Sequence, residues 1–426
     1  MVSSLSVGLK KPLGSWIEAA HRQDNRGQKK SKPAIPTINH LRVTGFIPSW
    51  GICGTKIATG DLNILYCGYY KISNKIVSFV VKLRQMDISK YIKKFGRISF
   101  RDFMEHALYC TEDGYYGAGK VKIGGVNMDF ITHPMSTSPF FGRGLVRQIE
   151  DMWQLMRKPK KIEIVEIGGG YGVLARDILS EAKKHYPRLY RAIQYTVVEI
   201  SPSLIKKQKK VLAHFKDKVD YWTGSVLNFN KDIEGVVISN ELIDSLPVHR
   251  ILFKNGKLYE VYVKYVDGEY KEELFEVSKK ELSEFILGLG LKLFEGQHVC
   301  VSLDALKYIR RLSECLKKGF VITIDYGYLA EVLYGENLSH LRVAKDLKVG
   351  TYPYRNVAES DITSDVDFSS IIKQGRELGL KDVIFMNEYN FFKKWLNRDI
   401  DIKEGVDVAL EQFVGSNYKV LVQEKI

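Results

Sequence analysis

The chain has 426 residues, with 64 Lys+Arg against 50 Asp+Glu and a formal net charge of +14. A hydrophobic content of 45% and a charged content of 27% are ordinary for globular domains, which excludes a wholly disordered chain. The five cysteines form no CxxC pair, which argues against a disulfide scaffold or zinc ribbon and favours a reducing compartment. No uncharged apolar run reaches the roughly 18 to 20 residues of a membrane span.

The positive charge is concentrated in the first fifth of the chain. Residues 1–85 hold 13 Lys+Arg and three acids, whereas residues 86–426 hold 51 basic and 47 acidic residues. A sequence pI near 9.2 favours a nucleic-acid or anionic partner. Because the remainder of the chain is nearly neutral, the charge distribution argues against nucleic acid as the substrate.

Residues 1–85 are predicted to be a basic N-terminal extension. The stretch 21–36 is polar, basic and punctuated by proline, as disordered tails are. An acid-poor leader that contains Arg, Lys and Ser is typical of a mitochondrial transit peptide, which would place the protein in the mitochondrial matrix. Two alternatives are a nucleic-acid arm and a misassigned start upstream of Met86; the last would leave a bacterial, cytoplasmic chain.

From Met86 the pattern becomes regular, and residues 86–160 are predicted to form a helical cap of a catalytic domain. Phe103, His106 and Ala107 have helical spacing, which predicts a helix over about 100–110. A turn-rich stretch follows. Apolar residues three and four apart then predict a second helix over 145–156.

An alternation of strands and helices begins at residue 161 and continues to about 247. Short apolar runs predict strands at 162–167, 195–200, 219–222 and 236–239. Helices are predicted at 173–185 and, after the cap pair Ser201-Pro202, up to about residue 214. Strands that alternate with helices are typical of a parallel sheet, so the fold class predicted is α/β, with a doubly wound Rossmann-like sheet.

The alternation is interrupted over residues 248–300. Strands at 248–253, 258–266 and 270–277 are joined by Asn-Gly and Asp-Gly, which favour two-residue hairpin turns. We therefore predict an inserted antiparallel β-meander followed by a helix. A helix at 303–316 and a strand at 320–324 then return to the α/β core, and residues 301–426 are predicted to complete it and to supply a C-terminal substrate-side region.

A glycine loop between the first strand and the first helix of the core is the sharpest motif. Glu166 is followed by Gly168, Gly170 and Gly172 at GxGxG spacing, and glycines there permit tight turns and close approach of a ligand. Val173 occupies the place of the last glycine of a dinucleotide motif, which argues against a pyrophosphate site. A carboxylate before the loop suits the cationic amino group of S-adenosylmethionine (SAM).

Further polar residues end the next strands of the predicted sheet. Glu199 lies where doubly wound folds place an acid for ribose hydroxyls, and Asn240, Glu241 and Asp244 follow the strand predicted at 236–239. Ser225 is a candidate for contact with the adenine edge, although loop hydroxyls more commonly form turns. Because ligands bind outside the carboxyl ends of such strands, we expect these groups to share one crevice with the glycine loop; a glycine turn with exposed acids, or capping by Asn240, is the alternative.

These motifs occur in an order that resembles a known family. The sequence is similar to the MidA-like class I SAM-dependent methyltransferases, whose mitochondrial members assist complex I assembly. The resemblance covers about residues 100 to 375, and its segments are DGYYGAG (114–119 and the residue before), DFITHP (129–134), VEIGGGYGVLARDIL (165–179), VVEISPSLIKKQ (197–208), SNELIDSLPVHR (239–250), ITIDYGY (322–328) and DITSDVDFS (361–369).

The resemblance implies a class I methyltransferase fold and methylation of protein arginine. It implies that the three glycines cradle SAM, that Glu199 holds the ribose, and that the 240–247 segment lines the active crevice. It also implies a protein partner that contains arginine, in a setting such as a respiratory-complex assembly. This chain departs from the family pattern at positions that we expect to face the substrate, namely Met135, Arg143, Gly169, Tyr171 and Leu242-Ile243.

Arginine is a poor nucleophile, because its positive charge is delocalised and its pKa is above about 12. Carboxylates that bond two of its nitrogens would localise the charge there and free the third nitrogen for attack on the methyl group. Glu241 and Asp244 are the first candidates for this catalytic role. Acids elsewhere are secondary candidates, and surface or capping roles are the alternative for each of them: Asp325, Asp361, Asp365 and Asp367.

The histidines indicate no catalytic or metal site, and two alternative functions remain open. His106, His133 and His249 share no spacing for a metal site or a triad, so structural or surface roles are expected and no metal is predicted. The alternative functions are a non-catalytic SAM-binding assembly factor and an RNA methyltransferase, which would bind RNA in a salt-sensitive way. The sequence indicates neither the acceptor protein nor the oligomeric state.

Overall fold

The computed structural model describes residues 65–67, 70–72, 86–124, 128–336, 341–396, 410–411 and 417–425. All of them belong to the unit Gly51–Ile426. The predicted basic extension, residues 1–85, lies outside the described residues except for the antiparallel pair β1 (Leu65–Cys67) and β2 (Tyr70–Ile72). In the described part of the chain, no helix is both long and apolar enough to cross a membrane.

The central sheet follows from the predicted alternation of strands and helices. Its order is β17-β18-β12-β7-β4-β5-β6, and neighbouring strands from β12 to β6 are parallel. The strand β18 runs antiparallel to both β12 and β17, and β16 adds a short parallel pair to β12. The strands are β4 (Ile162–Ile167), β5 (Ile193–Glu199), β6 (Val219–Thr223), β7 (Ile233–Asn240), β12 (Leu316–Tyr328), β16 (Val366–Asp367), β17 (Lys381–Asn387) and β18 (Tyr418–Lys425).

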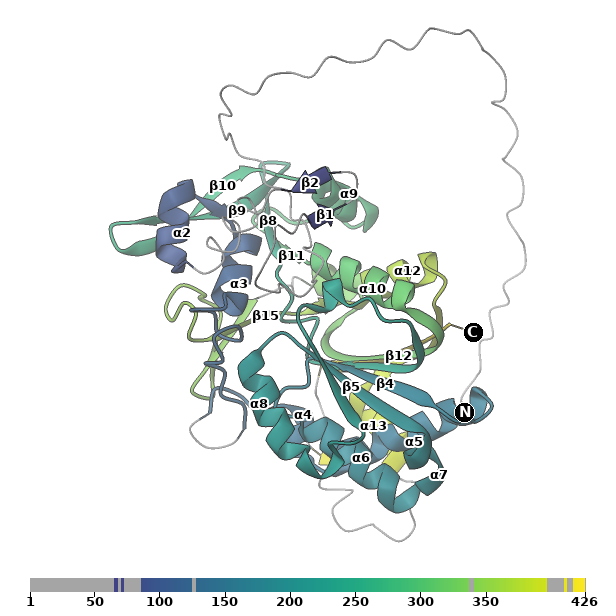
Figure 1. The fold of residues 1–426 in the computed structure, drawn as a ribbon. Helices are drawn as coiled ribbons and strands as arrows, with labels where there is room; N and C mark the ends of the chain where they lie inside the picture. The colour runs from purple at the N-terminus through teal and green to yellow at the C-terminus, as the bar shows by residue number, and fades with distance from the viewer. Residues whose placement is uncertain are drawn as a thin grey trace, which may run out of the picture. The chain divides into compact units, whose positions relative to one another are not determined.

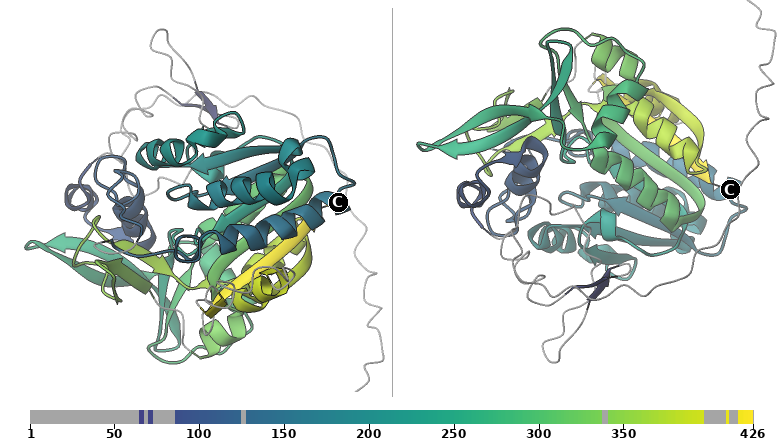
Figure 2. Two further views of the ribbon diagram at one scale, coloured as in Figure 1. Left: turned by 90° about the horizontal axis from the view of Figure 1, so that it is seen from below. Right: turned by 90° about the horizontal axis from the view of Figure 1, so that it is seen from above.

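Helices cover both faces of this sheet, which confirms the doubly wound fold (Figures 1 and 2). Ile162 and Ile164 of β4 face one apolar cluster, and Val165 and Ile167 face the other. Four of the six residues of β4 are apolar and face these two clusters, as expected for a strand covered on both faces. One face carries α5 (Phe140–Leu155), α6 (Val173–His185), α7 (Pro187–Ala192) and α13 (Glu388–Leu396); the other carries α10 (Leu303–Cys315), α12 (Phe368–Glu377) and the turn η2 (Val226–Asn228).

The predicted meander is present and is part of a larger antiparallel sheet. Its strands β8 (His249–Lys254), β9 (Lys257–Val266) and β10 (Glu269–Glu276) pair in sequence. Asn255 and Asp267 have φ of +53° and +55°, and a glycine with positive φ follows each of them. This is the pattern of two-residue hairpin turns. Two strands that the pattern did not predict complete the sheet, namely β3 (Ile98–Ser99) and β11 (His298–Val301).

The N-terminal helical cap packs on this second sheet. Helices α2 (Ile88–Phe95) and α3 (Phe100–Tyr109) share an apolar cluster with β9 and β11. The helix predicted at 145–156 begins earlier, at Phe140, and packs instead on the central sheet as α5. Shorter elements complete the chain: α4 (His133–Ser136), α8 (Pro202–Val211), η1 (Ala213–Phe215), α9 (Lys280–Gly288) and α11 (Ala330–Gly335).

A third sheet of three strands lies between α11 and α12 in the sequence. It consists of β13 (Leu341–Lys345), β14 (Lys348–Gly350) and β15 (Asp361–Ser364), in the order β14-β13-β15. The backbone N–H of Ser364 donates to the carbonyl of Asp244 at 2.9 Å, which joins β15 to the segment after β7. This sheet was not predicted, and it brings Asp361 to the carboxyl end of the central sheet.

Candidate functional site

The glycine loop has a backbone that only glycine adopts readily. Gly168, Gly170 and Gly172 have φ of +73°, +51° and +82°. A Cβ added to Gly172 would lie 3.3 Å from the Cα of Gln208 on α8, so the loop is in close contact with that helix. A Cβ on Gly170 would meet only Ile123, at 3.8 Å. The loop is therefore packed on one side and open on the other, as a ligand cradle must be.

Two buried carboxyls lie beside the loop at the ends of β4 and β5. The Tyr195 hydroxyl donates to Glu166 at 2.9 Å, and burial raises the pKa of Glu166 to about 7. Glu199 accepts from the backbone N–H of Ser201 at 2.9 Å and from the Gln208 amide at 3.1 Å, and burial raises its pKa to about 7. A ligand that brings a positive charge or hydroxyl donors would favour the ionised form of both groups.

Several buried polar atoms around the loop have no hydrogen-bond partner within the described residues. They are Ser201 Oγ, Gln208 Oε1, Asn240 Oδ1 and Asp244 Oδ1. Ser201, Asn240 and Asp244 lie at or just after the carboxyl ends of β5 and β7, and Gln208 lies on α8, which packs against the glycine loop. Since buried polar groups are normally satisfied, these atoms indicate a ligand with its own donors, and the amino and ribose hydroxyl groups of SAM fit that requirement.

Ser225 has the turn-forming role that was its alternative. Its hydroxyl accepts from the backbone N–H of Leu227 at 3.3 Å and caps the turn η2. It follows β6, so it still lies at the carboxyl edge of the sheet. A contact with adenine stays a prediction for this residue.

Glu241 lies in a strained backbone conformation directly after β7. Its φ is +48°, which is unfavourable for a residue with a side chain. Its carboxylate accepts from the Asn240 amide and from the Tyr418 hydroxyl, each at 3.0 Å. Burial and the neighbouring Asp244 raise the pKa of Glu241 to about 7. Backbone strain at a buried carboxyl is a feature of functional sites.

Asp244 and Asp361 complete a group of three carboxyls, which we call the acid crevice: Glu241, Asp244 and Asp361. The Tyr326 hydroxyl is hydrogen-bonded to Asp244, and burial raises the pKa of that carboxyl to about 6. The Tyr116 hydroxyl donates to Asp361 at 2.9 Å, and burial together with Asp244 raises the pKa of Asp361 to about 8. Like charges held this close favour binding of a cation.

The other predicted acids have partners within the chain. Asp325 accepts from the backbone N–H groups of residues 242, 243 and 244 at 3.2, 2.8 and 3.3 Å, so it fixes the segment that carries Glu241 and Asp244. Asp365 pairs with Arg342 at 2.8 Å. Asp367 caps α12 through the N–H of Ser370 at 3.2 Å. These contacts fit positioning and structural roles better than contact with a substrate.

Aromatic side chains enclose the acid crevice, and the sequence reasoning did not single them out. Tyr109 donates to the backbone carbonyl of Ser245 at 2.9 Å and stacks on Tyr116 at 5.8 Å. The Tyr418 ring lies against the His133 ring, with centroids 4.3 Å apart and planes tilted by 34°. Tyr116 and His133 lie in segments of the resemblance, whereas Tyr109 and Tyr418 lie outside all of them and carry no sequence signal.

His133 has a closer relation to the crevice than expected from the sequence. Its Nδ1 lies 2.6 Å from a carboxylate oxygen of Glu388. Burial alone would lower the pKa of His133, but the hydrogen bond and charge of Glu388, together with Glu241, raise it. His106, by contrast, contacts the backbone of Met86, and His249 pairs with Glu260 inside the second sheet at 2.7 Å, as structural histidines do. Within the described ranges, no group of three or more His, Cys, Asp or Glu could hold a metal ion.

The positions at which this chain departs from the family pattern do not all face the substrate side. Arg143 pairs with Glu181 at 2.7 Å between α5 and α6, so the expectation is wrong for this residue because its charge is used to join two helices. Tyr171 remains at the site. Its hydroxyl donates to the carbonyl of Val121 at 3.1 Å and accepts from Lys207 at 3.0 Å, which ties the glycine loop to the 121–123 segment and to α8.

Comparison with known proteins identifies the family. A family model described as "Putative S-adenosyl-L-methionine-dependent methyltransferase" (Methyltransf_28) matches residues 144–386. A Xenopus laevis protein named "Protein arginine methyltransferase NDUFAF7, mitochondrial" is 27% identical over 368 residues, which is 79% of this chain and 77% of that protein. The Drosophila melanogaster homologue of the same name is 26% identical over 300 residues, 65% of this chain and 66% of its own length.

The fold also matches a solved structure with a bound ligand. A COG1565 superfamily protein from Burkholderia thailandensis, bound to S-adenosyl-homocysteine, superposes with a TM-score of 0.71 at 21% identity, over 85% of this chain and 95% of that one. The class I methyltransferase fold is therefore confirmed. With a family model that spans more than half of its length, this chain belongs to the Methyltransf_28 family of S-adenosyl-L-methionine-dependent methyltransferases, and S-adenosyl-L-methionine is its cofactor.

Proposed function

We propose that this methyltransferase acts on the side chain of arginine in a protein. The observation that carries the proposal is the acid crevice, in which Glu241, Asp244 and Asp361 gather at the end of the sheet that also bears the glycine loop. Each carboxyl has a raised pKa, so a delocalised cation would relieve their mutual repulsion. The names of the curated relatives, "Protein arginine methyltransferase", support the same acceptor.

The cofactor supplies a methyl group on a sulfonium, which an acceptor nitrogen displaces in line. Gly168, Gly170 and Gly172 would hold it against the backbone, Glu166 would take its amino group and Glu199 its ribose. Asn240 and Ser225 are the further cofactor candidates. The packed and open sides of the loop and the unpartnered oxygen of Asn240 support these roles.

The acceptor guanidinium would be oriented by two carboxylates. Glu241 and Asp244 would each accept from it, leaving the third nitrogen directed at the methyl group. Methyl transfer forms one N–C bond and releases one proton, which a carboxylate with a pKa of about 7, such as Glu241, can take. Asp325 acts as a positioning residue, because it holds the backbone that carries both acids.

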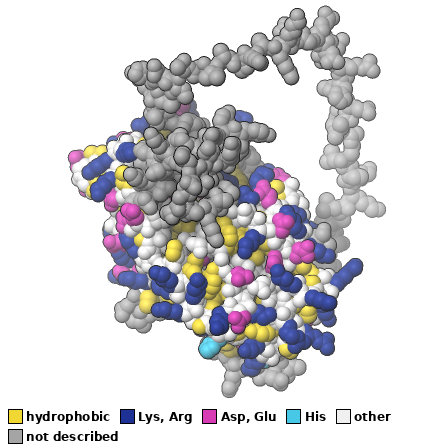
Figure 3. All heavy atoms as spheres, in the orientation of Figure 1, with side chains coloured by type: hydrophobic (Ala, Val, Ile, Leu, Met, Phe, Trp, Pro, Cys, Tyr) yellow, Lys and Arg dark blue, Asp and Glu magenta, His cyan; other side chains and the backbone are white. Residues whose placement is uncertain are grey.

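An RNA acceptor receives less support from the surface. On the face shown in Figure 3, Lys and Arg side chains are scattered among Asp and Glu instead of forming one continuous basic area. A nucleic-acid enzyme would be expected to present a basic stripe beside its catalytic crevice. The crevice residues here are acidic and aromatic.

We also infer a mitochondrial setting for the acceptor, with a subunit of a respiratory complex as its class. The word "mitochondrial" in the names of the relatives and the basic composition of residues 1–85 support this inference. A fusion of residues 1–85 to a fluorescent protein should enter mitochondria of a eukaryotic host. Uniform cytoplasmic fluorescence would contradict it.

The deciding experiment supplies methyl-tritiated SAM and the full chain to a cell extract and identifies the labelled acceptor by mass spectrometry. We expect methylated arginine in one or a few proteins. Glu241→Gln should abolish the label, while Glu234→Gln, an exposed acid at the other end of β7, should leave it unchanged. Label on lysine, RNA or a small molecule would refute the arginine proposal, and SAM binding without transfer would favour the non-catalytic assembly factor.

A further inference from the structure

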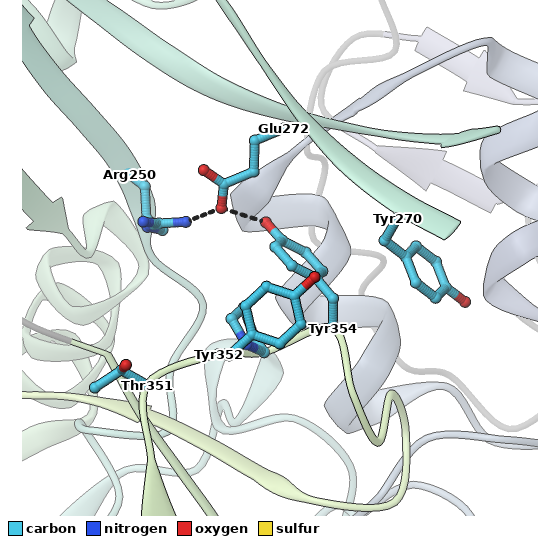
Figure 4. A pocket seen from close by; sticks show the side chains of 7 residues that line it. Arg250, Tyr270, Glu272, Thr351, Tyr352 and Tyr354 are labelled. Carbon is cyan, nitrogen blue, oxygen red and sulfur yellow. Dashed lines mark hydrogen bonds and ion pairs between the residues drawn. The ribbon is translucent and has the colours of Figure 1, made fainter. Parts of the chain in front are cut away.

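A pocket separate from the cofactor loop and the acid crevice lies between the meander and the segment after β14. It has a volume of about 310 Å³. Its walls come from Arg250 on β8, from Tyr270 and Glu272 on β10, and from residues 351–354 (Figure 4). None of these residues belongs to the glycine loop or to the acid crevice, so this hollow has no role in the chemistry described above.

The walls of this pocket are tyrosine rings that differ sharply in exposure. Tyr352 is 59% exposed at the rim, whereas Tyr354 is 9% exposed below it. The two rings meet edge to face with centroids 5.4 Å apart, and Tyr270 lies parallel to Tyr354 at 6.2 Å. Tyr352 is thus a large ring held on a buried aromatic base with one side left to solvent. Such a ring offers a rigid stacking surface at low cost in conformational entropy.

The floor of the pocket is polar but carries no net charge. Glu272 forms an ion pair with Arg250 and accepts from the Tyr354 hydroxyl at 2.7 Å, as Figure 4 shows. The Arg250 guanidinium also lies over the ring of Phe100 at 5.0 Å. The Arg250 guanidinium also bonds the Tyr354 hydroxyl, so those of its five N–H donors that neither Glu272 nor Tyr354 uses can meet a carbonyl oxygen. The floor therefore suits a neutral ligand with hydrogen-bond acceptors and disfavours a charged one.

Aromatic walls and donors for carbonyls are the features that recognise extended, proline-containing polypeptide. Proline rings stack on tyrosine, and the extended backbone around them exposes carbonyls that have no internal partner. A free aromatic metabolite would not need the carbonyl donors. A charged peptide segment would meet a neutral floor.

Helix α3 connects this pocket to the acid crevice. Near its start, Phe103 contacts Tyr354 at 5.1 Å and Tyr270 at 5.6 Å. At its end, Tyr109 bonds Ser245, the residue after Asp244. Six residues of helix at about 1.5 Å each place the Cα atoms of Phe103 and Tyr109 about 9 Å apart along the helix axis, which sets a rough minimum for the separation of the two sites. An extended chain advances about 3.1 to 3.4 Å per residue, so a bound polypeptide needs at least about three residues to span them.

We propose that this pocket binds a proline of the acceptor polypeptide, at least about three residues from the arginine that enters the acid crevice. The proposal rests on the proposed function and adds a sequence preference to it. The pocket would anchor the acceptor chain, and the crevice would orient its guanidinium.

The test uses the full chain and thirteen-residue Gly/Ser peptides with one central arginine and one proline at each distance from two to six residues on either side. Initial rates of methyl transfer give kcat and KM for each peptide. Fluorescent copies of all these peptides, with alanine in place of arginine, measure binding by anisotropy without any turnover. Tyr352→Ser removes the exposed ring, and Val349→Ser, 70% exposed on β14 and outside the pocket, is the matched control.

We expect the lowest KM at one particular distance of three or more residues between proline and arginine. For that peptide Tyr352→Ser should raise KM and the anisotropy Kd about tenfold with kcat unchanged, while Val349→Ser should change neither. Equal affinity of the alanine peptides for the parent chain and for Tyr352→Ser would overturn the proposal, and so would a KM independent of the position of proline. Failure of every peptide and extract protein to accept methyl would instead refute the proposed function, because the anisotropy measurement still decides the pocket.

Discussion

Replacement of Gly170 by alanine separates the cofactor role of the glycine loop from its contribution to the fold. Gly170 has φ of +51°, and an added Cβ would meet only Ile123, at 3.8 Å. The cost to the folded chain is therefore the conformational penalty of a left-handed residue, about 1 to 2 kcal/mol. If the open side of the loop holds SAM, the same methyl group would also occupy ligand space.

Gly96 provides the matched control for this substitution. It has φ of +79° at the end of α2, and a Cβ added there would meet nothing within 4 Å. Gly170→Ala and Gly96→Ala should lower the thermal midpoint by a similar few degrees. Only Gly170→Ala should weaken binding of S-adenosyl-homocysteine in calorimetry, by at least about tenfold or 1.4 kcal/mol. If Gly170→Ala lowered the thermal midpoint as Gly96→Ala does but left the affinity for S-adenosyl-homocysteine unchanged, the loop would not cradle the cofactor.

Three further changes test the acids. The rate of methyl transfer should rise with pH through about 7 as Glu241 ionises. Single-turnover rates of Glu241→Gln should be reduced about a hundredfold or more and should lose this pH dependence, while calorimetry should show unchanged affinity for SAM. Because the pKa of Asp361 is raised to about 8, the folded chain keeps a proton on this carboxyl that the unfolded chain releases near pH 4. The free energy of unfolding therefore falls as pH rises from about 4 to about 8. Asp361→Asn should raise the thermal midpoint at pH 8.5 and leave it unchanged at pH 4. The pKa of Asp304 is lowered to about 2, so its effect on stability runs the other way with pH: the pair with Arg101 stabilises the fold above about pH 4 and is lost as pH falls toward 2. Asp304→Asn should lower the free energy of unfolding in urea by about 3 kcal/mol at pH 7, and this effect should be absent at pH 2.

Local signals were sufficient for the elements that position the cofactor. The strand 162–167 and the helix 173–185 were predicted with the bounds that the structure gives them. The apolar residues Ile162, Ile164, Val165 and Ile167 face the two sides of the sheet, and the glycines mark where the strand ends. The two hairpin turns of the meander carried equally local signals, because Asn-Gly and Asp-Gly supply the left-handed residues that such turns require.

Elements that depend on distant pairing could not be predicted in the same way. The strand β18 lies between β12 and β17, and its partner Phe320 is about a hundred residues from Glu424 in the sequence. In the third sheet β13 and β14 form a local hairpin, whereas β15 pairs with β13 over a longer separation, Leu341 with Ser364. These strands are only three to five residues long, too short to show a period in the sequence. The acid crevice depends on this sheet, since Asp361 reaches Asp244 only when β15 docks after β7.

The roles of the acids depend on which backbone and side-chain donors each one meets, and the residue type alone does not predict this. Asp325 and Asp367 are aspartates like Asp244, yet they accept hydrogen bonds from backbone N–H groups that cannot move away without loss of a turn or a helix cap. Glu241 instead accepts from the side chains of Asn240 and Tyr418, which can rotate. A carboxylate satisfied by side chains can exchange its donors for those of a guanidinium, whereas one satisfied by backbone amides is committed to the fold. This contrast is why Glu241 is the stronger candidate for contact with the acceptor and Asp325 the stronger candidate for holding it in place.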